Sequence, residues 1–131
     1  MGYGGVLDEG TERIAKQVVD AIFRVHMNLG AGLIESVYVQ CLVLELQSRG
    51  LKVQREVQVP IFYLDQRIEP GLRLDLLVEE KIIIEAKSVE TMHPVFFSKT
   101  KTYLKLSGKR LGFLVNFNVP LIKDGITRMI V

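Results

Sequence analysis

The sequence predicts an α/β fold built around a mixed β-sheet, and three observations support this class. Two helical stretches come first, three extended stretches follow, and another helix then precedes a short apolar strand. A strand that follows another through a helical crossover pairs with it in parallel, whereas strands joined by tight turns pair antiparallel. Both kinds of connection are expected here, so the sheet should be mixed and flanked by helices.

The chain of 131 residues fits one domain of ordinary size. It has no evident repeat, linker or low-complexity segment, so one domain is expected over residues 1–131, with residues 1–8 as a flexible end. The start lacks an apolar signal region, and no stretch approaches the ~20 apolar residues of a bilayer span. The single cysteine, Cys41, rules out an internal disulfide. We therefore expect a cytoplasmic protein without a membrane partner.

The first two helices are predicted from the spacing of apolar residues. Such residues recur three or four positions apart up to a stop at Gly30, which predicts an amphipathic helix over Glu9–Leu29. A second run predicts a helix over Leu33–Arg49, followed by Gly50. Alternation of apolar and polar residues from 51 to 69 then predicts one or two strands that end at a turn at Pro70-Gly71.

The remaining elements follow from turn and helix-start signals. Leu72–Val78 and Ile82–Lys87 are expected to form a hairpin. Pro94 opens a helix over Val95–Leu106, which ends before Gly108. After it, the apolar run 111–117 is typical of a buried strand, and residues 126–131 are expected to add one more.

Three charged residues interrupt the apolar strands of the predicted hairpin. Charges in core strands are unfavourable unless they are paired or bind an ion. Glu85 and Lys87 are two positions apart, so they share one face of their strand. Asp75 lies opposite Glu85 if the turn has three residues, Glu79–Lys81, whereas a two-residue turn would place it opposite Ile84, on the other face.

Two carboxylates on facing strands repel each other unless a metal ion or a lysine lies near them. Mg²⁺ is typically held by one or two carboxylates together with substrate phosphates, and Asp75 and Glu85 would supply that set. The ammonium group of Lys87 could then stabilise negative charge on a phosphodiester under attack. Mutual neutralisation without any ligand is the alternative, and Glu-x-Lys alone is a weak signal, since Glu79–Lys81 also satisfies it.

Basic residues are concentrated in the last third of the chain. The stretch from Thr91 to Lys123 contains no Asp or Glu. Its basic residues are Lys99, Lys101, Lys105, Lys109, Arg110 and Lys123. Such a basic field suits a polyanion such as nucleic acid, with a solvated helix surface as the alternative.

The order of these motifs resembles the PD-(D/E)XK nuclease superfamily, whose αβββαβ core carries Asp on its second strand and Glu-x-Lys on its third. Within it, the chain is similar to the small GxxExxY proteins, because Gly32, Glu35 and Tyr38 in "GLIESVY" match that name. The tail "YLKLSGKRLGFLVNFNVPLIKDGITRMIV" is also similar to theirs. The resemblance covers nearly the whole chain from Ile14, and implies a restriction-endonuclease-like core with an extra N-terminal helix.

The resemblance implies a magnesium site, with manganese as a substitute. Asp75 and Glu85 would be ligands, the backbone carbonyl of Ala86 a further ligand, and Lys87 catalytic. Glu35 would be an additional acidic site residue from the first core helix, although the helix dipole alone could explain a glutamate in a first turn.

Tyr38 and Lys99 are expected to have different roles. Tyr38 is expected to be a core residue with a hydrogen-bonded hydroxyl rather than a phosphate ligand. Lys99 stands where GxxExxY proteins commonly carry a glutamine, four residues before a Tyr-Leu pair. A lysine there can still contact phosphate, so Lys99, Lys101 and Lys105 are the predicted nucleic-acid-binding residues.

Two functions are therefore open. The first is a magnesium-dependent nuclease that hydrolyses DNA or RNA. The second, which Lys99 in place of glutamine favours, is a catalytically weak or inactive module that binds nucleic acid or a protein partner. Nucleic acid is the expected partner, and a homodimer is left open.

Overall fold

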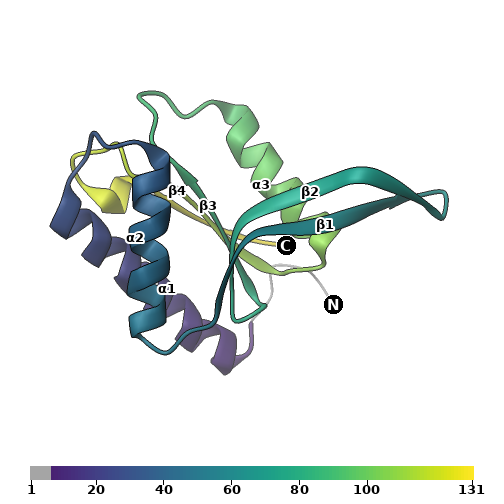
Figure 1. The fold of residues 1–131 in the computed structure, drawn as a ribbon, viewed down its shortest axis with the longest axis horizontal. Helices are drawn as coiled ribbons and strands as arrows, with labels where there is room; N and C mark the ends of the chain where they lie inside the picture. The colour runs from purple at the N-terminus through teal and green to yellow at the C-terminus, as the bar shows by residue number, and fades with distance from the viewer. Residues whose placement is uncertain (1–6) are drawn as a thin grey trace.

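The computed structural model describes residues 7–131 (Figure 1). The predicted flexible end, residues 1–8, falls almost entirely outside these residues. The elements are α1 (Glu9–Leu29), α2 (Glu35–Ser48), β1 (Val53–Tyr63), β2 (Gln66–Val78), β3 (Ile82–Lys87), α3 (Pro94–Ser107), β4 (Leu111–Asn116), the 3₁₀ helix η1 (Ile122–Gly125) and β5 (Ile126–Ile130).

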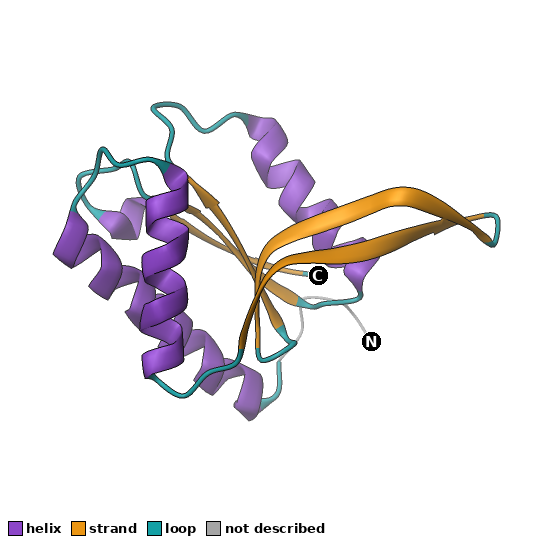
Figure 2. Cartoon of the chain, viewed as in Figure 1, coloured by secondary structure: helices purple, strands orange, loops and turns teal. Residues whose placement is uncertain are grey.

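The five strands form one sheet in the order β1-β2-β3-β4-β5. β3 and β4, which α3 connects, are parallel, and the other neighbouring pairs are antiparallel. Helices α1 and α2 lie on one side of the sheet and α3 lies on the other (Figure 2). The predicted mixed α/β architecture, with a helical crossover before β4 and a further strand at the end, is therefore confirmed.

Local capping explains where the first two helices begin and end. The Asp8 carboxylate accepts a hydrogen bond from the backbone N–H of Thr11 at 2.7 Å, which caps α1 at its predicted start. The Tyr38 hydroxyl donates to the Gly30 carbonyl at 2.6 Å and accepts from the Leu33 N–H at 3.1 Å. These bonds fix the loop between the helices, so α2 begins at Glu35 rather than at Leu33.

The predicted turn at Pro70-Gly71 is wrong. The chain reverses at Leu64 and Asp65, whose φ angles of 49° and 62° suit a tight hairpin turn. Gly71 instead lies inside β2, where a side chain would clash with the backbone of Val59 on β1. The pairing register shifts beside it, so this glycine permits a close approach of two strands at an irregularity.

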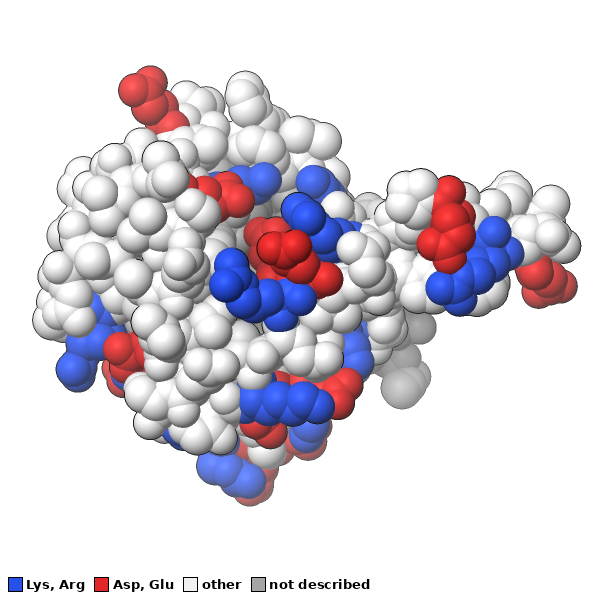
Figure 3. Space-filling view, viewed as in Figure 1, with Lys and Arg blue, Asp and Glu red and all other residues white. Residues whose placement is uncertain are grey.

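The hairpin is consequently longer than the sequence indicated. β1 and β2 continue beyond the body of the protein as a two-stranded arm (Figure 1). On the face shown in Figure 3, acidic and basic side chains lie next to one another around the root of this arm and along it, whereas the surface over α1 and α2 is largely uncharged. The charged region of this face is thus near the point where β2 enters the sheet.

The hydrophobic core is divided unequally between the two sides of the sheet. Among the described residues, the cluster beneath α1 and α2 contains twenty buried residues, whereas the cluster beneath α3 contains four, Leu74, Leu77, Ile83 and Leu104. The α3 side therefore leaves room for polar groups at the ends of the strands. Within residues 7–131, no helix has the length and apolarity needed to cross a membrane.

Candidate active site

The register of β2 and β3 decides whether the predicted carboxylates meet. Val78 pairs with Ile82 across a turn of three residues, as required for Asp75 to lie opposite Glu85. The ladder continues through Leu76 and Ile84. Ile83 belongs to the cluster beneath α3, so alternation directs Glu85, two residues further along β3, to that side of the sheet. Alternation along β2 is irregular beside Asp75, because Leu74 and Leu77 both belong to this cluster although they are three residues apart.

Beyond Leu76, backbone N–H groups of the two strands donate hydrogen bonds to side-chain carboxylates instead of to backbone carbonyls. The Asp75 N–H donates to Oε2 of Glu85 at 3.0 Å, and the Ala86 N–H donates to Oδ2 of Asp75 at 3.1 Å. Each carboxylate thus accepts a hydrogen bond from the opposite strand, which fixes both side chains. In the described part of the chain, Oδ1 of Asp75 and Oε1 of Glu85 accept no such bond and remain for another ligand.

The electrostatics of this pair favour a cation. Only 6% of Glu85 is exposed. Burial first, and the charge of Asp75 second, raise the pKa of Glu85 from its ordinary value of 4.5 to about 8, although the Asp75 N–H, Lys99 and Lys87 oppose the shift. Nearby positive charge therefore does not balance the two carboxylates, and carboxylate oxygens are ligands that Mg²⁺ and Mn²⁺ prefer. The residues present fit such an ion.

Glu35 approaches this pair from the first turn of α2. The Ser88 hydroxyl donates to the Leu33 carbonyl at 2.5 Å and ties the loop before α2 to the chain just after β3. Partial burial, followed by the charge of Asp75, raises the pKa of Glu35, and Lys87 and Lys99 oppose that shift. Within residues 7–131, however, no three acidic, histidine or cysteine side chains are gathered closely enough to form a metal site by themselves.

Lys87, the last residue of β3, is held against an aromatic ring. Its Nζ lies 4.4 Å from the ring centroid of Phe96, in the first turn of α3. The ring of His93 meets Phe96 edge-on, with 5.7 Å between centroids. A cation at this distance is attracted to the face of a ring, so Phe96 restricts where the ammonium group can lie. Sequence reasoning missed Phe96, because a half-buried aromatic residue in a helix gives no signal for such a role.

Asn116 is a second residue that sequence reasoning missed. It pairs with Lys87 across β3 and β4 and is only 4% exposed. Its side-chain amide donates to the Val89 carbonyl at 3.0 Å and accepts from the Val89 N–H at 3.1 Å. It therefore fixes the path of the chain as it leaves Lys87. A polar residue at the end of an otherwise apolar strand was the available signal.

The three predicted nucleic-acid-binding lysines do not share one surface. The charge of Lys99 opposes the rise in the pKa values of both Glu35 and Glu85, and its Nζ lies 5.5 Å from the centroid of the Tyr103 ring. Lys101 and Lys105 line a different pocket.

The other motif residues support the α2 loop. Gly32 has a φ of 96°, a conformation that favours glycine. Tyr38 is fully buried and stacks on Phe117, with 4.5 Å between ring centroids. Its expected role as a core residue with a hydrogen-bonded hydroxyl is confirmed, and it positions the loop that leads to Glu35.

Comparison with known proteins assigns the family. A family model described as the PD-(D/E)XK nuclease superfamily matches residues 12–129. Comparisons with curated proteins and with solved structures give no match. The five-stranded mixed sheet, flanked by helices and preceded by α1, is consistent with a restriction-endonuclease-like fold. Nucleases of this superfamily generally use divalent metal ions, and membership implies nucleic-acid binding. Since the match spans almost the whole chain, the chain belongs to the PD-(D/E)XK nuclease superfamily.

Proposed function

We propose that the chain is a cytoplasmic, metal-dependent nuclease of the GxxExxY branch, forming one domain over residues 1–131 and hydrolysing phosphodiester bonds in DNA or RNA. One observation carries the proposal. The Asp75 N–H donates to the Glu85 carboxylate and the Ala86 N–H donates to the Asp75 carboxylate, so within residues 7–131 each carboxylate keeps one oxygen free, and Lys87 follows on the same side of the sheet as Glu85. A purely structural role would not require a buried carboxylate, Glu85, to lie beside a second carboxylate that repels it.

Mg²⁺, or Mn²⁺ in its place, would be held by Asp75, Glu85 and the carbonyl of Ala86. An all-oxygen donor set suits these hard cations, and positive charge here would oppose the burial and the Asp75 charge that together raise the pKa of Glu85. When bound, the ion would supply Lewis-acid stabilisation of phosphate charge and make water more acidic.

The side chains around the pair have complementary tasks in this proposal. The ammonium group of Lys87, restrained by Phe96, would stabilise negative charge on the phosphate oxygens. Glu35, at the edge of the pair, would accept a hydrogen bond from water, and partial burial raises its pKa, the direction that suits a general base. Lys99, on the exposed side of α3, would contact a neighbouring phosphate.

A second candidate function is a module that binds nucleic acid without cleaving it. It is favoured by the position of Lys99, whose positive charge acts on both Glu35 and Glu85. A lysine there could supply part of the charge that a metal ion would otherwise bring. Such a module would bind with an affinity that falls steeply as salt is raised, because phosphate contacts release counterions.

A cleavage panel separates the two functions. Single-stranded, duplex and branched DNA and RNA would be incubated with Mg²⁺ or Mn²⁺ and wild-type protein, Asp75→Asn or Lys87→Gln. The matched control is Lys81→Gln, because Lys81 completes the other Glu-x-Lys sequence in the β2–β3 turn. We expect Lys87→Gln to reduce cleavage by about 100- to 1,000-fold, and Lys81→Gln to leave it unchanged.

Two outcomes would contradict the nuclease proposal. Cleavage that persists unchanged in both Asp75→Asn and Lys87→Gln would show that the chemistry lies elsewhere. Binding of the same substrates without cleavage under any metal condition would support the module instead.

A further inference from the structure

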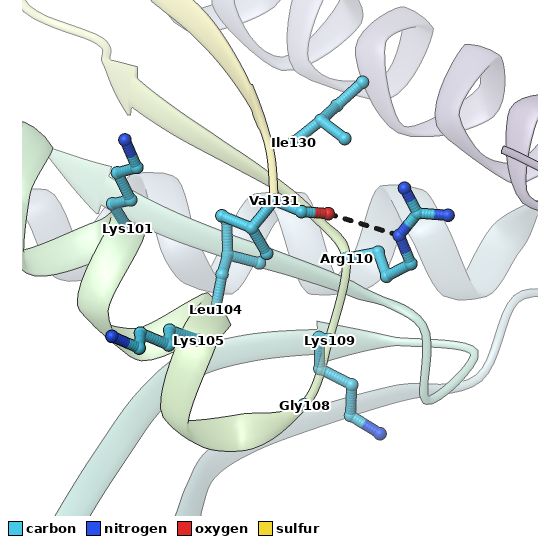
Figure 4. Close-up of a pocket in the computed structure, with 8 residues that line it drawn as sticks. All are labelled: Lys101, Leu104, Lys105, Gly108, Lys109, Arg110, Ile130 and Val131. Carbon is cyan, nitrogen blue, oxygen red and sulfur yellow. Dashed lines mark hydrogen bonds between the residues drawn. The ribbon is translucent and has the colours of Figure 1, made fainter. Parts of the chain in front are cut away.

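A pocket of about 550 Å³ lies on the α3 side of the protein, outside the candidate active site (Figure 4). We call it the basic groove and define it by its lining residues, Lys101, Leu104, Lys105, Gly108, Lys109, Arg110, Ile130 and Val131. Figure 4 shows that Lys101 and Lys105 come from α3, whereas Lys109 and Arg110 come from the loop that leads into β4. Two separate segments therefore contribute basic residues to the lining of one pocket.

The basic groove combines positive charge with an apolar floor. Leu104, Ile130 and Val131 supply the apolar surface. Within residues 7–131, none of the groove's lysines forms an ion pair, while Nε of Arg110 donates to the Val131 carbonyl at 3.2 Å.

Lys109 acts on one acidic residue, Glu80, which already forms an ion pair with Lys52. A hydrogen bond from Lys52 is the main cause of the lowered pKa of Glu80, and Lys109 has a lesser effect. Glu80 pairs with Lys52 at 3.0 Å. The charge of the groove is therefore available to an external anion.

The groove and the carboxylate pair lie at opposite ends of two paired strands. In the parallel ladder of β3 and β4, Ile82 is level with Leu111 and Lys87 is level with Asn116. Arg110 thus lies near the start of β3, whereas Lys87 lies at its end. Five steps along a strand at ~3.3 Å per residue separate the two levels by about 16 Å.

We propose that the basic groove is a second binding site for the phosphodiester backbone of the nucleic acid. The inference rests on the proposed function for the class of substrate. Phosphates would lie against the cationic rim and sugars against the apolar floor, which matches the alternation of charged and apolar groups along a nucleic-acid strand. A separation of about 16 Å corresponds to about five nucleotides of a duplex strand at ~3.4 Å each, so binding at both sites requires a substrate of at least that length.

Binding can be measured apart from cleavage. Fluorescence anisotropy would measure the binding of labelled single-stranded DNA, duplex DNA and RNA in EDTA at several salt concentrations. Each ligand would be used at about 20 nucleotides or base pairs, which is about four times the distance between the groove and the carboxylate pair, and at about 4, which is shorter than that distance. The variants are Lys101→Gln/Lys105→Gln and Lys109→Gln, whose circular dichroism would be compared with wild type. The matched control is Lys16→Gln, an exposed lysine on α1.

The double variant should reduce the slope of log affinity against log salt by about 2, and Lys109→Gln by about 1, since each lost phosphate contact lowers the slope by roughly one. The reduction should be present for the long ligands and smaller for the short ones, and Lys16→Gln should match wild type. Equal slopes in the groove variants and in Lys16→Gln would overturn the proposal. Displacement of the nucleic acid by poly-glutamate at equal charge concentration would also overturn the proposal, because it would indicate that the groove binds an acidic protein.

The result is independent of whether the protein cleaves. Groove-dependent binding without cleavage by the wild-type protein would retain the second site and reject the nuclease. Cleavage with unaltered binding in the groove variants would retain the nuclease and reject the second site.

Discussion

The two sides of the sheet differ in what they bury, and neighbouring residues of β3 illustrate this difference. Ile84 is fully buried in the twenty-residue cluster beneath α1 and α2. Glu85, the next residue, is 6% exposed on the other side, where it meets Asp75 instead of apolar side chains. One side therefore provides most of the stability of the sheet. The other can hold charges that would be unfavourable in a continuous core.

The larger core should account for the largest effect on stability. Ile84→Ala is expected to lower the free energy of unfolding by about 2–5 kcal/mol, because it removes a fully buried side chain from a packed cluster. Denaturant unfolding would measure the change. Stability equal to that of wild type would contradict the comparison between the two sides.

Tyr38 links the core to the candidate active site. Tyr38→Phe removes the partner of both the Gly30 carbonyl and the Leu33 N–H, and is expected to lower the free energy of unfolding by about 1–3 kcal/mol. The loop that carries Glu35 should also exchange its amide hydrogens faster. Hydrogen exchange measured by mass spectrometry tests this, with α3 as the internal reference, and equal protection of the loop in both proteins would contradict it.

Phe96 should affect catalysis more than stability. Phe96→Leu removes a cation–π contact of about 0.5–2 kcal/mol with Lys87, so we expect kcat to fall by about 2- to 30-fold with little change in KM. Phe96→Tyr keeps an aromatic face and should restore most of the activity. If Phe96→Tyr were as impaired as Phe96→Leu, the ring would not act through Lys87.

The stability of the protein should also depend on pH. The pKa of Glu85 is about 8 in the folded chain and close to 4.5 in an unfolded one, so the folded chain binds the extra proton between these values. The stability of the metal-free protein should therefore fall as pH rises from 4.5 to 8. Thermal melts of wild type and Glu85→Gln would measure this, because the variant lacks the titrating group. A difference between their melting temperatures that does not vary with pH would contradict the assignment.

Much of the fold could be predicted because local signals agreed with the tertiary structure. Helical spacing and a terminal glycine gave the bounds of α1 without error. The sequence left two hairpin registers open, and the structure adopts the one with a three-residue turn, in which the Asp75 N–H donates to the Glu85 carboxylate. The bounds of α1 and the two candidate registers both follow from a few residues along the chain.

Features that depend on distant contacts were missed. Gly71 resembled a turn residue, but its role is to allow close approach to Val59 on the neighbouring strand. Leu64 occupies the true turn, although leucine is not a residue that tight turns favour. The contact between Lys87 and Phe96 likewise depends on how α3 packs over the sheet, which no local pattern specifies.

The central claim is that the carboxylates of Asp75 and Glu85 form a cation site. Isothermal titration of the metal-free protein with MnCl₂ tests it most directly, using wild type, Glu85→Gln and the control Glu80→Gln, which changes an exposed acid in the adjacent turn. We predict one saturable binding event in wild type and in Glu80→Gln, and its loss in Glu85→Gln. Equal binding heats in Glu85→Gln and wild type, or no saturable heat in wild type, would contradict the claim.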